Sequence, residues 1–77
     1  MKAILWSKPG CGYCTMAESL LKNKGVDIDE RKIGFGWNRE QLFDAVPNAK
    51  TLPQIFLDGK YIGGYTELKK YYDERGE

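Results

Sequence analysis

The chain has 77 residues, of which 42% are hydrophobic and 30% are charged, with a formal net charge of +1. This near-neutral charge gives no reason to expect binding to nucleic acid or to an anionic membrane, and no apolar run approaches the length of a membrane span. Lys2 is followed by only four apolar residues, which is too few for a signal peptide, so we expect one cytoplasmic domain over residues 1–77.

The first part of the chain is predicted to form a strand, a helix and a second strand. Residues 3–6 are all apolar, as is typical of a strand that is buried on both faces. After a Pro-Gly break, a helix is expected over residues 12–24, ended by Gly25. Residues 26–33 alternate between apolar and charged side chains, which indicates a half-buried strand parallel to the first, joined to it by a right-handed crossover.

The second part of the chain is predicted to form a helix, a hairpin and a last helix. Asn38 and Gln41 have the spacing of a capping box, which places a helix over residues 39–46. Asp58-Gly59 separates two β-prone runs, residues 54–57 and 60–62, and predicts a hairpin. Thr66 is a suitable N-cap for a helix that ends near residue 75. The order β-α-β-α-β-β-α predicts an α/β fold, with a four-stranded mixed sheet flanked by three helices.

Aromatic residues occur both in a loop and within the predicted strands and helices. Phe35 and Trp37, in the loop after the second strand, either dock on the core or form an exposed patch for partner proteins, and we expect docking. Tyr61, Tyr71 and Tyr72 are expected to have packing roles.

The two cysteines of the chain, Cys11 and Cys14, lie at the start of the first predicted helix. The loop between them is too short for their disulfide to stabilise a fold, so the pair is predicted to be catalytic or metal-binding in a reducing compartment. Structural zinc takes four ligands, whereas this chain has no histidine and no second cysteine pair. Redox chemistry is therefore favoured over a zinc site.

The two thiols are expected to differ in reactivity. Three features are expected to stabilise the thiolate of Cys11: the unpaired N–H groups of the first helical turn, the helix dipole and the positive charge of Lys8. Thiols in such sites have pKa values of roughly 3.5–7.5. Lys8 could instead be a solvated loop lysine, the default for this residue type, although its position favours a role at the site. Cys14 shares the inward face with Ala17 and Leu21 and is predicted to act as the resolving thiol.

A second site is indicated by Thr51-Leu52-Pro53, immediately before an apolar strand. A cis Leu52–Pro53 bond would let Leu52 offer its N–H and C=O groups to an extended ligand beside Cys11. The alternative is a trans proline that begins a strand, which is much commoner.

Three motifs together carry a resemblance to a known family. They are Lys8-Pro9-Gly10-Cys11-Gly12-Tyr13-Cys14, Thr51-Leu52-Pro53-Gln54-Ile55-Phe56 and Gly63-Gly64-Tyr65-Thr66-Glu67-Leu68. In this order and spacing, the chain resembles a small dithiol glutaredoxin. The resemblance implies a thioredoxin fold and a monomeric enzyme of cell redox homeostasis and electron transport, which uses glutathione as its reductant. Its substrates would be protein disulfides and protein–glutathione mixed disulfides, with ribonucleotide reductase as a candidate partner.

The same resemblance assigns roles to individual residues. Cys11 would form the mixed disulfide with glutathione, and Cys14 would resolve protein disulfides. Lys8 would pair with the glycine carboxylate and Tyr13 would line the groove, while Leu52, beside a cis Pro53, would bind the cysteine of the tripeptide. The remaining groove residues are Thr51, Gly64, Tyr65 and Thr66, and the last two would hold the γ-glutamyl carboxylate.

The chain also departs from the usual pattern of the family. Gly12 replaces the usual proline between the cysteines. Some glutaredoxins with Cys-Gly-Tyr-Cys resemble members in which two chains and two glutathiones hold a [2Fe–2S] cluster through the residue equivalent to Cys11. Thr66 carries no charge to meet an ammonium group. Arg39 and Gln41 are candidates for a further contact to the glycine carboxylate. An iron–sulfur carrier or sensor, and a redoxin reduced by a flavoenzyme of the thioredoxin reductase type, are therefore the alternatives.

Overall fold

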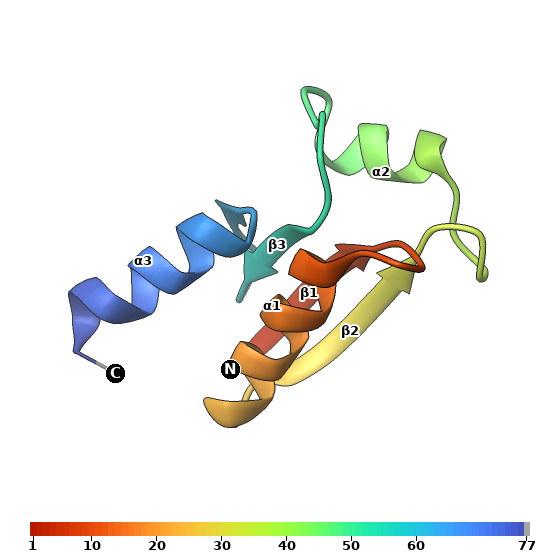
Figure 1. The fold of residues 1–77 in the computed structure, drawn as a ribbon. Helices are drawn as coiled ribbons and strands as arrows, with labels where there is room; N and C mark the ends of the chain where they lie inside the picture. The colour runs from red at the N-terminus through yellow and green to blue at the C-terminus, as the bar shows by residue number, and fades with distance from the viewer. Residues whose placement is uncertain (77) are drawn as a thin grey trace.

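The structure is a computed structural model that describes residues 1–76. Its elements follow the predicted order: β1 (Lys2–Ser7), α1 (Gly12–Asn23), β2 (Asp27–Lys32), α2 (Arg39–Ala45), β3 (Gln54–Leu57), β4 (Lys60–Gly63) and α3 (Tyr65–Arg75). The described strands form one sheet in the order β2-β1-β3-β4, with β1 parallel to β2 and the other pairs antiparallel. Figure 1 shows this mixed sheet with its helices, which confirms the predicted α/β architecture.

The main core lies between one face of the sheet and two helices, α1 and α3, which also contact each other. Alternate residues of the central strands point into this layer, as the period of two in a strand requires. The helices α1 and α3 contribute core residues that lie three or four positions apart, as the helical period requires. The buried cluster consists of Ala3, Leu5, Ala17, Leu21, Val26, Ile55, Leu57, Leu68 and Tyr72.

The hairpin between β3 and β4 has the turn that its sequence predicts. Asp58 and Gly59 have φ angles of 49° and 83°, and a two-residue hairpin turn with positive φ at both positions matches the twist of the flanking strands. The Asp58 carboxylate also accepts a hydrogen bond from the backbone N–H of Lys2 at 2.9 Å. The turn is thereby tied to the beginning of β1.

The start of α3 differs from the prediction. The helix begins at Tyr65 with Gly64 as its N-cap, so the assignment of Thr66 as the N-cap is wrong. The Glu67 carboxylate, three residues after the cap, accepts the hydrogen bond of the Gly64 N–H at 2.7 Å. This is the half of a capping box that the later residue supplies, and it needs no side chain at the cap itself.

On the exposed side of α3, the charged residues make local pairs, as expected of a solvated helix face. The Asp73 carboxylate accepts a hydrogen bond from Lys69 at 3.0 Å, and this bond raises the pKa of Lys69. Tyr72, on the opposite side, is 3% exposed. The helix therefore buries only the stripe that faces the sheet and α1.

The two aromatic residues of the loop after β2 behave differently. Trp37 packs edge-on against Trp6, with ring centroids 5.4 Å apart, and Arg31 lies 4.4 Å from the centre of the Trp37 ring. Phe35 is 66% exposed. Docking is therefore correct for Trp37 and wrong for Phe35, because the single indole contact already closes the loop onto the sheet.

The short helix α2 lies beyond the ends of β1 and β2 rather than within the main core (Figure 1). The predicted capping box is present: the Asn38 side chain accepts from the Gln41 N–H, and the Gln41 side chain accepts from the Asn38 N–H, both at 2.9 Å. Leu42, within the helix, and Val46, its C-cap, are buried. Within residues 1–76, no helix is both long enough and apolar enough to cross a membrane.

Candidate active site

The two cysteines form a disulfide at the junction of β1 and α1. Cys11 is the N-cap of α1, and its Sγ accepts a hydrogen bond from the Cys14 N–H at 3.2 Å. Cys14 is 4% exposed on the buried face of the helix, with Ala17 and Leu21, whereas Cys11 is only half-buried. The predicted difference in accessibility between the two sulfurs is therefore confirmed.

The sulfur of Cys11 lies against the turn that precedes β3. The Leu52–Pro53 peptide bond is cis, as predicted. Cys11 Sγ is 3.7 Å from the carbonyl oxygen of Leu52, and in the disulfide this sulfur has no proton to donate. The fold thus brings together two sequence motifs that are separated by 41 residues.

The conformation of this turn is supported by a polar contact that the sequence did not reveal. Gln54 is 5% exposed; its Nε2 donates to the carbonyl oxygen of Thr51 at 2.8 Å, and its Oε1 accepts from the Tyr61 hydroxyl at 2.6 Å. Both ends of the buried amide are satisfied, as a buried polar group requires. Tyr61 packs against Phe56, as expected, with ring centroids 5.4 Å apart, although it is 48% exposed; its hydroxyl makes the contact to Gln54 in addition.

An open groove runs beside Cys11, between the start of α1, the cis-proline turn and the start of α3. Its walls include two tyrosines, Tyr13 and Tyr65, whose stacked rings have centroids 5.9 Å apart and an interplanar angle of 27°. We call this cavity the tyrosine groove, and it is lined by Tyr13, Thr51, Leu52, Pro53, Gly64, Tyr65, Thr66 and Glu67. The structure therefore brings together seven of the residues that the sequence assigned to a ligand site.

Glu67 is the member of the groove that the sequence analysis missed. Its carboxylate accepts from the Gly64 N–H and also lines the cavity. The N–H groups of the first turn of a helix have no partners within the helix, so Tyr65 and Thr66 place donors at the same end of the groove. The groove thus combines a carboxylate with the positive end of a helix. The only signal in the sequence was the position of Glu67 three residues after the true N-cap.

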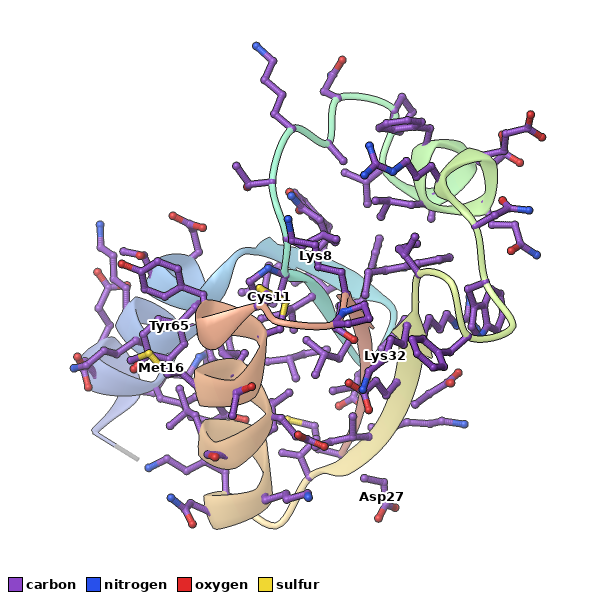
Figure 2. All side chains as sticks on the ribbon, turned by 45° about the vertical axis from the view of Figure 1, so that its right-hand side comes forward. Lys8, Cys11, Met16, Asp27, Lys32 and Tyr65 are labelled. Atoms are coloured by element: carbon purple, nitrogen blue, oxygen red, sulfur yellow. A yellow bond between two sulfur atoms is a disulfide. The ribbon has the colours of Figure 1, made fainter. Side chains whose placement is uncertain are left out.

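Lys8 lies on the other side of Leu52 from the tyrosine groove. It lines two cavities, one shared with Cys11 and Cys14 and one shared with α2, and Figure 2 shows Lys8 and Cys11 at the same end of the molecule. No ion pair within residues 1–76 involves Lys8. Of the two residues of α2 considered from the sequence, Arg39 lines the cavity shared with Lys8, while the Gln41 side chain is used in the capping box.

Comparison with known proteins agrees with this geometry. The family model described as Glutaredoxin matches residues 3–62 of the chain. The chain belongs to the glutaredoxin family. This family consists of thiol–disulfide oxidoreductases, and the Cys11–Cys14 pair of this glutaredoxin fits their active-site motif. The coarse assignment made from the three sequence motifs is thereby confirmed.

Among curated relatives, the glutaredoxin of Haemophilus influenzae is 35% identical over 82 residues, which cover 97% of this chain and 94% of that protein. The hybrid peroxiredoxin hyPrx5 of the same species is 38% identical over 68 residues, which are 88% of this chain but only 28% of that protein. Glutaredoxin-C4 of Arabidopsis thaliana is matched over 58% of its length. The chain therefore spans less than two thirds of the length of some curated relatives and nearly the whole length of others.

Solved structures give the same fold. Glutaredoxin 1 from Francisella tularensis, complexed with cacodylate, superposes with a TM-score of 0.80 and 31% identity, covering 96% of this chain and 94% of that one. A buckwheat glutaredoxin–glutathione complex has a TM-score of 0.74 and 26% identity, covering 95% and 70%. The thioredoxin fold expected from the resemblance is therefore confirmed for this glutaredoxin.

Proposed function

We propose that this chain acts as one glutaredoxin domain, which uses glutathione to reduce protein disulfides and protein–glutathione mixed disulfides in the cytoplasm. The observation that carries the proposal is the position of Cys11: a half-buried sulfur at a helix N-terminus, with the tyrosine groove beside it. A groove next to the attacking sulfur supports a glutathione-dependent enzyme over a redoxin that takes electrons directly from a flavoenzyme.

The first chemical requirement is a thiolate at Cys11. When the disulfide is reduced, the Cys14 N–H that points at Cys11 Sγ and the dipole of α1 favour the ionised sulfur. Lys8 adds a positive charge at the same end of the molecule. Cys14 lies a turn further along, on the buried face, where an apolar environment disfavours the thiolate.

With a protein–glutathione mixed disulfide, Cys11 alone completes the exchange. The Cys11 thiolate attacks the glutathione sulfur, the protein thiolate leaves and takes a proton from solvent, and a Cys11–glutathione disulfide remains. A second glutathione thiolate then attacks the glutathione sulfur of that disulfide. The products are oxidised glutathione and the free Cys11 thiolate. The incoming glutathione is oxidised and the protein sulfur is reduced, while the glutathione that came with the substrate stays in a disulfide throughout.

With a protein disulfide, both cysteines take part. Cys11 forms a mixed disulfide with the substrate, and Cys14, after losing its proton, attacks Cys11 Sγ and releases the reduced substrate. The product is the Cys11–Cys14 disulfide, which is the state of the protein in this structure. Two glutathione molecules then reduce it in two successive exchanges. Ribonucleotide reductase is a candidate substrate of this second route.

Glutathione is proposed to lie along the cis-proline turn. The main chain of Leu52 would pair with its cysteine, beside Pro53, and Lys8 would meet the glycine carboxylate, with Arg39 as the nearby residue of α2. The γ-glutamyl end would lie in the tyrosine groove, where Tyr65 and Thr66 direct N–H groups toward a carboxylate. The other proposed groove residues are Tyr13, Thr51 and Gly64. The glutathione complex of the buckwheat relative supports this class of ligand.

Replacing Glu67 with glutamine tests the γ-glutamyl end of this arrangement. The Glu67 carboxylate is the acidic group that lines the groove, so it would meet the ammonium group that uncharged Thr66 cannot. Glutamine keeps the oxygen that caps Gly64 but removes the charge. We expect the KM for glutathione to rise by about three- to tenfold with little change in kcat, since such a charge-assisted hydrogen bond contributes about 1 kcal/mol more than a neutral one.

The same measurement on Glu74→Gln, an exposed charge change near the end of α3, is the control. Steady-state turnover at varied glutathione concentration gives both constants. An unchanged KM in Glu67→Gln would show that the carboxylate serves only to cap α3.

The reductant itself is tested by a coupled assay. We expect the chain to reduce a small disulfide when it is supplied with glutathione, glutathione reductase and NADPH, and to show little turnover with thioredoxin reductase and NADPH. The consumption of NADPH is followed by its absorbance. Equal or faster turnover with thioredoxin reductase would overturn glutathione dependence and favour the flavoenzyme-reduced alternative.

The [2Fe–2S] alternative rests on Gly12. Space is open around this residue, because a Cβ placed there would meet no atom within 4 Å. Within residues 1–76, no group of three or more histidine, cysteine or acidic side chains could hold a metal ion, so a cluster would need a second chain and glutathione to complete its ligands. We therefore derive no step through iron, and keep dithiol catalysis as the proposed function.

A further inference from the structure

A second cavity adjoins the active site on the side of Leu52 that faces α2. We call it the basic pocket. It lies between the cis-proline turn, the end of β2 and α2, and Figure 2 shows Lys8 at this end of the molecule, above Cys11. The cavity is lined by Lys8, Ile33, Arg39, Leu42, Phe43, Ala49, Lys50, Thr51 and Leu52.

The basic pocket carries three positive charges and no negative one. Lys8, Arg39 and Lys50 line it, and no ion pair among residues 1–76 involves any of them. The acidic residues of α2, Glu40 and Asp44, are not among its lining residues. Cations that line one cavity without counter-charges attract an anionic ligand.

The basic pocket also has an apolar wall. Leu42, the buried residue of α2, is 5% exposed, while the neighbouring Phe43 is 45% exposed. Ile33 completes this wall from the end of β2. An exposed phenylalanine beside a buried leucine loses its contact with water when an apolar group of a ligand covers it.

Glutathione does not match this pocket well. Its residue on this side is glycine, which brings one carboxylate and no side chain. Even with its one carboxylate at Lys8 and Arg39, glutathione would leave Lys50 and the apolar wall uncovered. A ligand that fills the pocket needs a further negative charge and an apolar side chain.

The basic pocket is continuous with the place where a substrate is attached. Thr51 and Leu52 line both the basic pocket and the tyrosine groove, and the carbonyl oxygen of Leu52 is 3.7 Å from Cys11 Sγ. A peptide that is disulfide-linked to Cys11 and lies along Leu52 therefore extends into the basic pocket in one direction.

We propose that the basic pocket binds a segment of the protein disulfide substrate that carries an acidic and an apolar side chain within a few residues of its reactive cysteine. This inference rests on the proposed function, because it names the substrate class of the same reactive sulfur. Complementary charge at such a position increases the rate of association and discriminates between partners, so the pocket selects protein substrates beyond what glutathione itself contributes.

The test uses three short cysteine peptides, each supplied as a mixed disulfide with a small thiol and differing only near the cysteine. One carries Asp-Leu, one the neutral isostere Asn-Leu, and one Asp-Ala. We expect the wild-type chain to reduce the Asp-Leu peptide with a kcat/KM about tenfold higher than the Asn-Leu peptide at low ionic strength, a preference that weakens in about 0.5 M salt.

Two variants assign the preference to the pocket. Lys50→Glu should remove or reverse the preference for Asp-Leu over Asn-Leu, because the introduced carboxylate repels the aspartate of the peptide. Lys60→Glu, the same charge change on exposed β4 outside the pocket, is the matched control and should keep the preference. Phe43→Ser should remove the preference for Asp-Leu over Asp-Ala, with an unchanged far-ultraviolet circular dichroism spectrum as the check on its fold.

Equal kcat/KM values for the three peptides with the wild-type chain would overturn the inference, as would equal losses in Lys50→Glu and Lys60→Glu. Failure of the proposed function has a different signature. In that case, the wild-type chain would reduce no peptide, and no small disulfide, at the expense of glutathione.

Discussion

Replacing Cys11 with serine is expected to abolish reduction of both protein disulfides and glutathione mixed disulfides. In both proposed routes, the first step is an attack by Cys11, and a serine hydroxyl at this position is not ionised near neutral pH and so cannot make that attack. Cys14 cannot substitute for it, since that side chain is 4% exposed. The measurement is NADPH consumption in the glutathione reductase-coupled assay, with one substrate of each class.

Cys14→Ser is the matched variant, because it removes the second sulfur and leaves the first. It should retain turnover of glutathione mixed disulfides and lose most of its turnover of protein disulfides. A Cys14→Ser chain as inactive as Cys11→Ser on mixed disulfides would contradict the division of roles. The same result would follow if Cys14 were needed to hold α1 in place, so the melting temperature of both reduced variants should be compared.

Replacing Gly63 with alanine is expected to lower the free energy of unfolding by about 2–4 kcal/mol, through backbone strain and overpacking together. Gly63 has a φ of +120°, and a Cβ there would lie 3.0 Å from Cγ of Glu67 and 3.1 Å from its Cβ and Oε1. The residue ends β4 next to an irregularity in the strand register, between Ile55 and Phe56 of β3. The backbone at this point therefore has little freedom to relax.

The size of this effect is measured by thermal unfolding, where about 1 kcal/mol shifts the midpoint by roughly 4–8 °C in a domain of this length. Gly59→Ala is the control. Gly59 also has a positive φ, of +83°, but a Cβ there would meet nothing within 4 Å, so it should cost only the backbone term of about 1–2 kcal/mol. Equal losses in the two variants would show that Glu67 moves aside freely and that the contact at Gly63 contributes nothing.

Much of this fold follows from local chemistry that a sequence displays directly. The capping box at Asn38 and Gln41 and the Asp58-Gly59 turn depend on residues close together in the chain, and both form as predicted. The inward face of α1 was also predictable, because Cys14, Ala17 and Leu21 follow the helical period. Of these features, the period of α1 alone predicts that Cys14 is buried while Cys11 lies at the start of the helix.

The features that the sequence did not reveal depend on contacts between distant elements or on a competition between neighbours. Thr66 has the better side chain for an N-cap, but Glu67 satisfies the Gly64 N–H from within the helix and moves the start of α3. Gln54 reads as an ordinary strand residue until the fold places it between Thr51 and Tyr61. The amino-acid composition reveals neither the N-cap at Gly64 nor the two hydrogen bonds of the Gln54 side chain.

The basic pocket illustrates the same limit for the candidate site. Lys50 and Phe43 belong to segments that carry no recognised motif, and each is unremarkable as an exposed residue. Only the position of α2 beyond the end of the sheet brings both beside Leu52 and Lys8. With the proposed role of the basic pocket, substrate preference would differ between glutaredoxins whose reactive motifs are identical.

The order of the strands has a consequence for behaviour at high concentration. The sheet has two open edges, β2 and β4, and the sequence of β2, Asp-Ile-Asp-Glu-Arg-Lys, is charged at every position but one. Pairing of this edge with another copy would strip water from ionic side chains, and β4 is only four residues long. Both borders thus oppose the edge-to-edge growth that leads to fibrils.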